Sequence, residues 1–199
     1  MRYICIEGCI GAGKTTLATL LSERHQNTIL LENFEKHPFL DDFYSDIPTY
    51  AYETEIGFLL MHYHQIKKTF LSNVNTDVIS DFYIGKDLLF AESNIVHEKE
   101  LSIFKDLYEY LSSQLLKPNL IIYLKASNDL LLKRIKNRGR ENEKNVDLDY
   151  ISKLNAEYNN NYSKDVDGIK VLTIDMDKVD FLKNISAIDE LDEKINRFI

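Results

Sequence analysis

The feature that most constrains this chain is a glycine-rich loop close to its N-terminus. Residues 8–15 read GCIGAGKT, which matches the pattern G-x-x-x-x-G-K-[ST] without a gap. A short apolar run at residues 3–6 precedes the loop, and a helical stretch begins at Lys14. In this strand–loop–helix context, backbone N–H groups wrap a phosphate at the positive end of the helix. The pattern therefore predicts a nucleoside-triphosphate site.

Each part of this loop has an expected role in that site. Lys14 should reach the outer phosphates of the nucleotide, and the Thr15 hydroxyl should bind Mg²⁺. The loop residues expected to contact the nucleotide are Gly8, Cys9, Ile10, Gly11, Ala12, Gly13, Lys14, Thr15 and Thr16. Switch GTPases, motor ATPases and small-molecule kinases all use such a loop, so the rest of the chain must distinguish between them.

The remaining sequence alternates between short apolar runs and helical stretches. The runs are at residues 3–6, 28–31, 77–80, 120–124 and 171–174. The helical stretches are at residues 14–24, 48–71, 84–93, 98–116, 127–137, 149–162 and 186–198. Most runs are apolar on both faces, as in buried parallel strands. The alternation predicts one α/β domain over residues 1–199, with helices on both faces of a parallel sheet.

Composition excludes several classes of partner. The 199 residues carry a net charge of −8, which disfavours nucleic-acid polymers and anionic membranes. The longest apolar runs, at residues 56–61 and 120–124, are too short for a membrane helix. No apolar segment follows Arg2, so we expect no signal peptide and a cytoplasmic protein. Cys5 and Cys9 are expected to be reduced thiols packed as small apolar residues.

Basic side chains gather in the segment 125–144, which holds seven basic and three acidic groups. Arg134 and Arg138 are four positions apart and share one face of the expected helix. Gly139 should end that helix and let Arg140 move. A solvated helix end could carry the same charges. Beside a phosphate loop, however, they favour an arginine lid at about residues 138–146, because phosphoryl transfer needs positive charge on the moving group.

Two carboxylates directly follow expected strands. Glu32 comes after residues 28–31, and Asp81 comes after residues 77–80. The carboxyl ends of parallel strands form the ligand crevice, so both acids should face the phosphate loop. One could orient or deprotonate an acceptor hydroxyl, and the other could hold Mg²⁺. A lone acid at a strand end is more often a helix cap, but two acids beside a phosphate loop favour catalysis.

Five strings spread through the chain carry a resemblance to a known family. They are IEGCIGAGKTTLA, ENFEKHPFLDDFY, SDFYIGKDLLFA, KPNLIIYLKAS and RIKNRGRENE. Together they resemble the deoxynucleoside kinases, and most closely the bacterial deoxyadenosine/deoxyguanosine kinase branch. The resemblance implies a P-loop kinase fold with a five-stranded parallel sheet in the order 2-3-1-4-5. It also implies transfer of the ATP γ-phosphate to the 5′-hydroxyl of a deoxynucleoside, a purine being expected, with Mg²⁺ and in nucleotide salvage.

On the acceptor side, the resemblance makes Glu32 the carboxylate beside the 5′-hydroxyl and the first choice for the general base. Asp81 would serve Mg²⁺ together with Thr15, although it is the alternative base. Tyr44 and Glu143 would hold the sugar 3′-hydroxyl.

On the ATP side, the resemblance places Arg134 against the adenine, near Phe181. Arg138 and Arg140 would grip the phosphates and act in catalysis together with Lys14.

Three positions depart from the family pattern. Phe82 stands where the family has an arginine, so Lys86 or a lid arginine must supply that charge. His62 replaces another arginine, and we expect it to be a polar helix position like His64. Glu53 falls where a glutamine usually faces the base. An ionised glutamate offers acceptors only, which suits the two donors of guanine, so a preference for deoxyguanosine over deoxyadenosine is expected.

Two other functions remain open at this point. A thymidylate-kinase-like nucleoside monophosphate kinase would need basic residues near its acceptor, whereas residues 32–55 hold seven acids against Lys36 and His37. A non-catalytic kinase-like structural subunit would not need the intact motifs. The helices expected at 48–71 and 98–116 have more apolar positions than one sheet face can cover, which predicts a homodimer.

Overall fold

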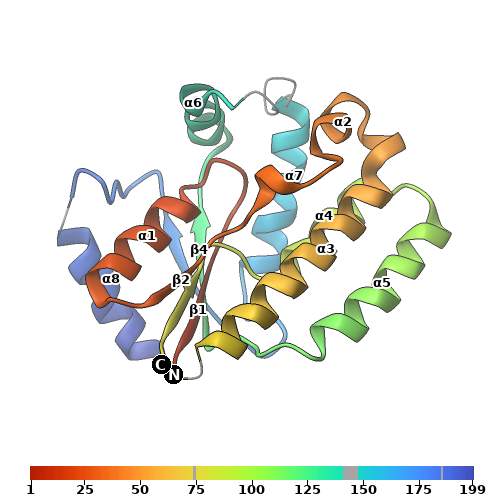
Figure 1. The fold of residues 1–199 in the computed structure, drawn as a ribbon. Coiled ribbons are helices and arrows are strands. Elements are labelled where there is room, and N and C mark those ends of the chain that lie inside the picture. Colours follow the sequence, from red (N-terminus) through yellow and green to blue (C-terminus); the bar gives the residue numbers. More distant parts are fainter. Residues whose placement is uncertain (74, 141–147, 185) are drawn as a thin grey trace.

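The computed structural model describes residues 1–73, 75–140, 148–184 and 186–199. At its centre is a five-stranded sheet in the order β2-β3-β1-β4-β5 (Figure 1). Every pair of neighbouring strands is parallel. The strands are β1 (Tyr3–Glu7), β2 (Thr28–Leu30), β3 (Val78–Ser80), β4 (Leu120–Lys125) and β5 (Lys170–Asp175). The expected α/β fold and its strand order are confirmed.

Helices lie on both sides of this sheet (Figure 1). On one side are α1 (Lys14–His25) and α8 (Ser186–Phe198). On the other are α3 (Ile47–Ser72), α4 (Gly85–Asn94), α5 (Glu98–Ser112) and α7 (Leu148–Tyr162). Helix α5 packs on α3 and α4. Two helices, α2 (Leu40–Ser45) and α6 (Asn128–Arg138), lie beyond the ends of the strands and flank the phosphate loop.

The strands bring the functional loops together because their apolar faces leave only one register. Leu120, Ile121 and Ile122 of β4 are fully buried. Cys5 of β1 pairs with Ser80 of β3 on one side and with Ile121 on the other. The carboxyl ends of β1, β3 and β4 are therefore aligned, and the loops that follow them meet at one edge of the sheet.

Local signals set the ends of the helices beside the site. The Asp46 carboxylate caps α3 by accepting a hydrogen bond from the Thr49 amide at 3.4 Å. At α6, the Ser127 hydroxyl accepts from the Leu130 amide at 3.4 Å. Gly139 ends α6 with a φ of 66°, as predicted for a helix-terminating glycine.

The helices α5 and α2 differ from the sequence expectation. Helix α5 ends at Ser112 rather than at residue 116, and the Ser113 hydroxyl donates to the carbonyl of Tyr110. Such side-chain hydrogen bonds compete with the helical ladder. The short helix α2 was not expected, because six residues carry too little periodicity.

Cys5 and Cys9 are free and buried, as predicted. No helix in the described ranges has the length and apolarity needed to cross a membrane.

Candidate active site

The phosphate loop lies between β1 and α1 and is held in shape by glycines. Gly8 and Gly13 have φ angles of 153° and 104°, which glycine adopts without strain. A Cβ atom on Gly8 would lie only 2.8 Å from the carbonyl oxygen of Leu124, on the neighbouring strand. The Lys14 ammonium donates to the carbonyl oxygens of Gly8 at 2.7 Å and Cys9 at 3.2 Å. The lysine charge is therefore held inside the loop.

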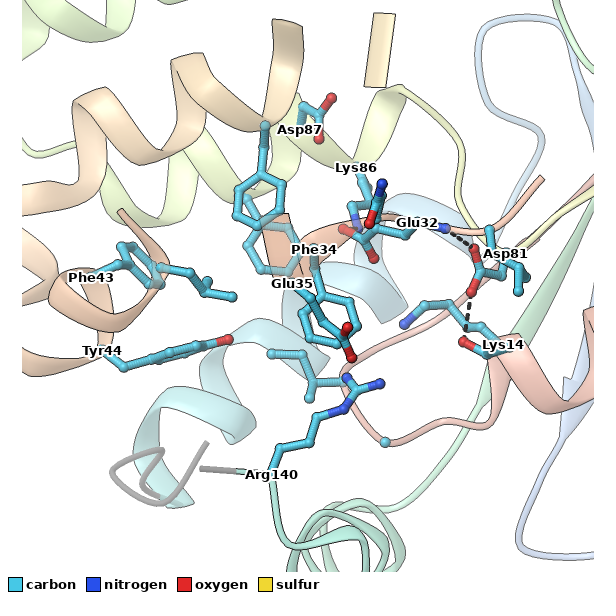
Figure 2. Close-up of a pocket in the computed structure, with 18 of the residues that line it drawn as sticks. Lys14, Glu32, Phe34, Glu35, Phe43, Tyr44, Asp81, Lys86, Asp87 and Arg140 are labelled. Atoms are coloured by element: carbon cyan, nitrogen blue, oxygen red, sulfur yellow. Dashed lines mark hydrogen bonds and ion pairs between the residues drawn. The ribbon is translucent and has the colours of Figure 1, made fainter. Parts of the chain in front are cut away.

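Asp81 joins this loop to the end of β2. One of its carboxylate oxygens accepts a hydrogen bond from the Thr15 hydroxyl at 2.6 Å. The other accepts from the backbone amide of Glu32 at 2.7 Å. Both bonds are drawn in Figure 2. The two acids expected at the strand ends thus lie side by side next to the phosphate loop.

The Glu32 carboxylate is surrounded by cations. Its Oε1 atom lies 2.5 Å from the Lys86 ammonium and 3.2 Å from Nε2 of His62. Burial alone would raise the pKa of Glu32, but the charge of Lys86 and the hydrogen bond from His62 lower it well below its usual range. For Lys86 the effects are reversed: burial alone would lower its pKa, but the charge of Glu32 raises that pKa above its usual range. The Lys86 ammonium also lies 6.0 Å from the centroid of the Phe82 ring, so this lysine is one of the two sources of charge that the sequence left open.

His62 links Glu32 to a second buried acid. Its Nδ1 atom lies 2.7 Å from Oδ1 of Asp87. The imidazole is fully buried between the rings of Phe58 and Phe82, whose centroids are 5.5 Å and 4.5 Å away. Burial would lower the pKa of His62, but the charge of Asp87 and the hydrogen bonds to the two acids raise it to about 9. His62 lies on a helix, as expected, but it is buried and paired with two acids, whereas His64 is exposed.

Two cavities meet at the phosphate loop. The first has a volume of about 340 Å³ and is lined by Glu32, Tyr44, Asp81 and Lys86 among others. Tyr44 and Phe43 lie at the opposite end of this cavity from Lys14 and Asp81 (Figure 2). The second has a volume of about 450 Å³. The side chains and loop residues that line both are Gly11, Lys14, Thr15, Arg138 and Arg140.

The second cavity collects the residues expected to bind ATP. Arg134 and Phe181 both line it, and the Arg134 guanidinium donates to the carbonyl oxygen of Ala12 at 2.7 Å. Five loop residues line this cavity: Gly11, Gly13, Lys14, Thr15 and Thr16. Ile10 lines the first cavity instead. Gly8, Cys9 and Ala12 are buried and line neither one, since they form the base of the loop.

Only the first residues of the expected lid are described. Arg138 and Arg140 border both cavities, and the Arg140 guanidinium lies over the Phe34 ring, 4.0 Å from its centroid. Glu143 and the rest of the proposed lid lie outside the described residues.

The placement of Glu53 corrects the sequence expectation. Glu53 is exposed on α3 and lines neither cavity, whereas Glu55 is buried and lines the first one. Two positions along a helix correspond to a rotation of about 200°, which turns one side chain toward the cavity and the other away. Glu55, not Glu53, is therefore the glutamate that faces the first cavity.

Sequence reasoning missed Glu55, His62 and Asp87 as site residues. A signal for the first two was present, because they are seven positions apart and so share one face of α3. Leu59 and Ile66 lie on the same buried face. Charged residues within an apolar helical stripe indicate a function, because burying them without partners is costly.

Glu7 is a third buried acid, besides Glu55 and Asp87, that the motif search did not single out. Its carboxylate accepts from the backbone amides of Tyr83 at 2.5 Å and Gly8 at 3.3 Å. Burial raises its pKa to about 7 against the opposing charges of Lys86 and Lys14. Glu7 thus ties the phosphate loop to the segment that leads into α4.

Known proteins resemble this chain along nearly its whole length. Residues 4–199 match the family model for deoxynucleoside kinases. The chain is 37% identical to a deoxyguanosine kinase of Bacillus subtilis strain 168, over 99% of this chain and 97% of that protein. It is 32% identical to a deoxyadenosine kinase of Lactobacillus acidophilus, over 98% and 97% of the two chains.

Solved structures show the same likeness. A deoxyadenosine kinase from M. mycoides with dCMP and dCDP bound superposes with a TM-score of 0.83 at 25% identity, covering 98% of this chain and all of that one. The same enzyme with bound dATP also gives a TM-score of 0.83. The family match over residues 4–199 and the 37% identity along nearly the whole chain show that this chain belongs to the deoxynucleoside kinase family.

Proposed function

We propose that this protein transfers the γ-phosphate of ATP to the 5′-hydroxyl of a deoxynucleoside, with purine deoxynucleosides as its substrates. The observation that carries this proposal is the meeting of two cavities at Lys14 and Thr15. One cavity holds the groups suited to ATP, and the other holds carboxylates and aromatic rings. The names of the relatives, deoxyguanosine kinase and deoxyadenosine kinase, support the substrate class.

In the proposed reaction, the 5′-oxygen forms a bond to the γ-phosphorus while the bond between that phosphorus and the β–γ bridging oxygen breaks. The 5′-hydroxyl proton passes to a carboxylate, for which Glu32 is the first choice. Glu32 stays ionised because Lys86 and His62 hold its pKa low. Asp81, which lies beside Glu32, is the alternative base that the family resemblance leaves open. Positive charge at the meeting point of the cavities would stabilise the transferring phosphoryl group.

Thr15 and Asp81 fit Mg²⁺ as a companion of ATP. Their hydroxyl and carboxylate oxygens are hard ligands, 2.6 Å apart beside the phosphate loop. Mg²⁺ commonly keeps several waters and takes one or two protein oxygens together with substrate phosphates. When bound, it would neutralise phosphate charge. No group of three or more His, Cys, Asp or Glu that could hold a metal occurs among the described residues, which is compatible with such a shared site.

The first cavity, which we call the acceptor cavity, suits an uncharged nucleoside better than a nucleoside monophosphate. Lys86, the lysine on its α4 wall, is already paired with Glu32. Glu35 and Asp87 add acidic groups to the lining, whereas its other basic side chains, Lys14, Arg138 and Arg140, also border the ATP cavity. A second phosphate in this cavity would therefore meet carboxylates.

The deciding experiment is an assay of ADP formation from ATP and Mg²⁺, with each of the four deoxynucleosides and each of their monophosphates as acceptor. We expect turnover with deoxyguanosine and deoxyadenosine, and at least tenfold lower kcat/KM with monophosphates. Turnover only with monophosphates would identify a monophosphate kinase. No turnover with any acceptor would favour a non-catalytic protein and overturn the proposal.

We further propose that the protein acts in the cytoplasm as a homodimer that covers the outer faces of α3 and α5. Large apolar side chains are exposed there: Leu60, Leu71, Ile103 and Tyr110. Light scattering coupled to size-exclusion chromatography should give twice the 23.2 kDa mass of one chain. The double substitution Leu60→Glu and Ile103→Glu should return the mass to that of a monomer. A monomeric wild type would contradict the dimer.

A further inference from the structure

The side-chain amide of Asn94, which is buried behind the acceptor cavity, holds Glu55, which faces that cavity. Asn94, the last residue of α4, donates from Nδ2 to Oε1 of Glu55 at 2.9 Å. Asn94 is buried and does not line the cavity, whereas Glu55 is equally buried and does. Since the amide N–H can only donate, it fixes Oε1 of Glu55 as an acceptor.

The surroundings of Glu55 favour its neutral form. Burial raises its pKa to about 8, in opposition to the hydrogen bond from Asn94. The charge of Asp87 raises the pKa further, while Lys86 and His62 lower it. From α7, Tyr150 also faces Glu55, and burial keeps the pKa of that phenol well above its usual range. The neutral acid would carry its proton on Oε2, because Oε1 already accepts the hydrogen bond from Asn94.

We propose that Asn94 is a specificity-determining positioning residue, which fixes neutral Glu55 as a donor through Oε2 and an acceptor through Oε1. This inference rests on the proposed deoxynucleoside kinase activity and on Glu55 contacting the base. It changes the expected substrate preference, because a neutral glutamate, like a glutamine, presents one hydrogen-bond donor and one acceptor.

The two purines respond differently to the charge of Glu55. Neutral Glu55 can donate to N1 of adenine and accept from its N6 amine. It can equally donate to O6 of guanine and accept from N1–H. Ionised Glu55 offers acceptors only, which still match the N1–H and N2 amine of guanine but oppose N1 of adenine. Both purines are therefore accepted at neutral pH, and deoxyadenosine is disfavoured as Glu55 ionises.

The first test is the ratio of kcat/KM for deoxyadenosine to that for deoxyguanosine between pH 6.5 and 8.5. A ratio cancels every pH effect that both substrates share, and this range stays below the ionisation of guanine. For one group with a pKa near 8, the ratio should fall about fourfold over this interval. Glu55→Gln mimics the neutral acid at every pH, so its ratio should match that of wild type at pH 6.5 and stay constant.

The second test reverses the hydrogen bond. In Asn94→Asp the new carboxylate accepts, which pulls the Glu55 proton onto Oε1 and leaves Oε2 as an acceptor. At pH 6.5 this variant should lower the deoxyadenosine-to-deoxyguanosine ratio at least threefold. Asn94→Leu keeps the volume without a donor and checks whether loss of packing alone changes the ratio. Thermal unfolding of each variant verifies that it folds, and Glu53→Gln, exposed on the same helix, should behave as wild type.

The outcomes separate this inference from the proposed function. If wild type phosphorylates neither purine deoxynucleoside, the proposed function fails. If it phosphorylates both and the ratio changes neither with pH nor in Asn94→Asp, the kinase assignment stands and the role of Asn94 is wrong. A ratio that changes equally in Asn94→Leu and Asn94→Asp would also overturn the inference, since it would reflect packing rather than the direction of the hydrogen bond.

Discussion

His62 and Asp87 form a fully buried pair in which Nδ1 of the imidazole lies 2.7 Å from the carboxylate, although 25 positions separate them in the chain. The other ring nitrogen of His62 reaches Glu32 at 3.2 Å. One imidazole thus connects a residue on the wall of the acceptor cavity to the proposed catalytic carboxylate. A charged His62 satisfies both acids, because each ring nitrogen then donates.

This pair should make folding stability depend on pH. The pKa of His62 is raised from 6.5 to about 9 in the folded protein. Its contribution is therefore complete below pH 6.5 and is lost as the pH rises through about 9. Compared with His62→Gln, wild type should lose up to about 3 kcal/mol more free energy of unfolding between pH 6 and pH 9.5.

Urea unfolding at several pH values measures this difference directly. His64→Gln is a matched control, because His64 is exposed on the same helix. It should follow the wild-type pH dependence. Identical pH profiles for wild type and His62→Gln would show that His62 is neutral in the folded protein.

The role of Glu32 can be tested by Glu32→Gln. The phosphate loop is untouched, so ATP should bind with unchanged affinity, while kcat should fall by roughly 10²–10⁴, the usual contribution of a positioned general base. Initial rates and ATP titration measure the two quantities separately. Glu53→Gln, exposed on α3, controls for the loss of a glutamate charge. A Glu32→Gln rate within threefold of wild type would transfer the role of base to Asp81.

The arginines that border both cavities should act on the moving phosphoryl group. Arg138→Ala and Arg140→Ala should each lower kcat much more than they raise the KM for the nucleoside, because transition-state charge is what they stabilise. Arg197→Ala on α8, whose partner is the exposed Glu193 at 3.4 Å, serves as the control. An unchanged kcat with a raised nucleoside KM would mean that these arginines only position the substrate.

The part of the acceptor cavity near Tyr44 should discriminate between nucleosides by the hydroxyl groups of their sugars. We expect kcat/KM to be highest for deoxyguanosine, lower for guanosine and lowest for 2′,3′-dideoxyguanosine. Loss of the 3′-hydroxyl would leave buried polar groups without a partner. Tyr44→Phe should narrow the gap between deoxyguanosine and dideoxyguanosine, whereas Tyr52→Phe, outside both cavities, should not. A kcat/KM for guanosine at or above that for deoxyguanosine would contradict this prediction.

Much of the fold and of the ATP side could be predicted from the sequence. The phosphate loop is a contiguous motif, and its function depends on backbone conformation that glycines dictate locally. The strands are short apolar runs between helices, and such a pattern allows few topologies. Glu32 and Asp81 were found for the same reason, since the end of a parallel strand has a known place at the crevice.

The residues of the acceptor cavity could not all be predicted from the sequence, because tertiary packing decides which side chains enter it. Glu53 and Glu55 are equally plausible in sequence, and only the docking of α3 on the sheet decides that Glu55 enters the cavity. His62 and Asp87 come from different helices, and their pairing exists only where α3 and α4 pack together. The charge of Glu55 is likewise a consequence of burial, which favours the neutral acid, whereas the sequence analysis assumed an ionised glutamate at Glu53. Local sequence motifs determine the phosphate loop. The acceptor cavity depends instead on the protonation of buried side chains and on the direction of their hydrogen bonds, which arise from desolvation in the packed structure.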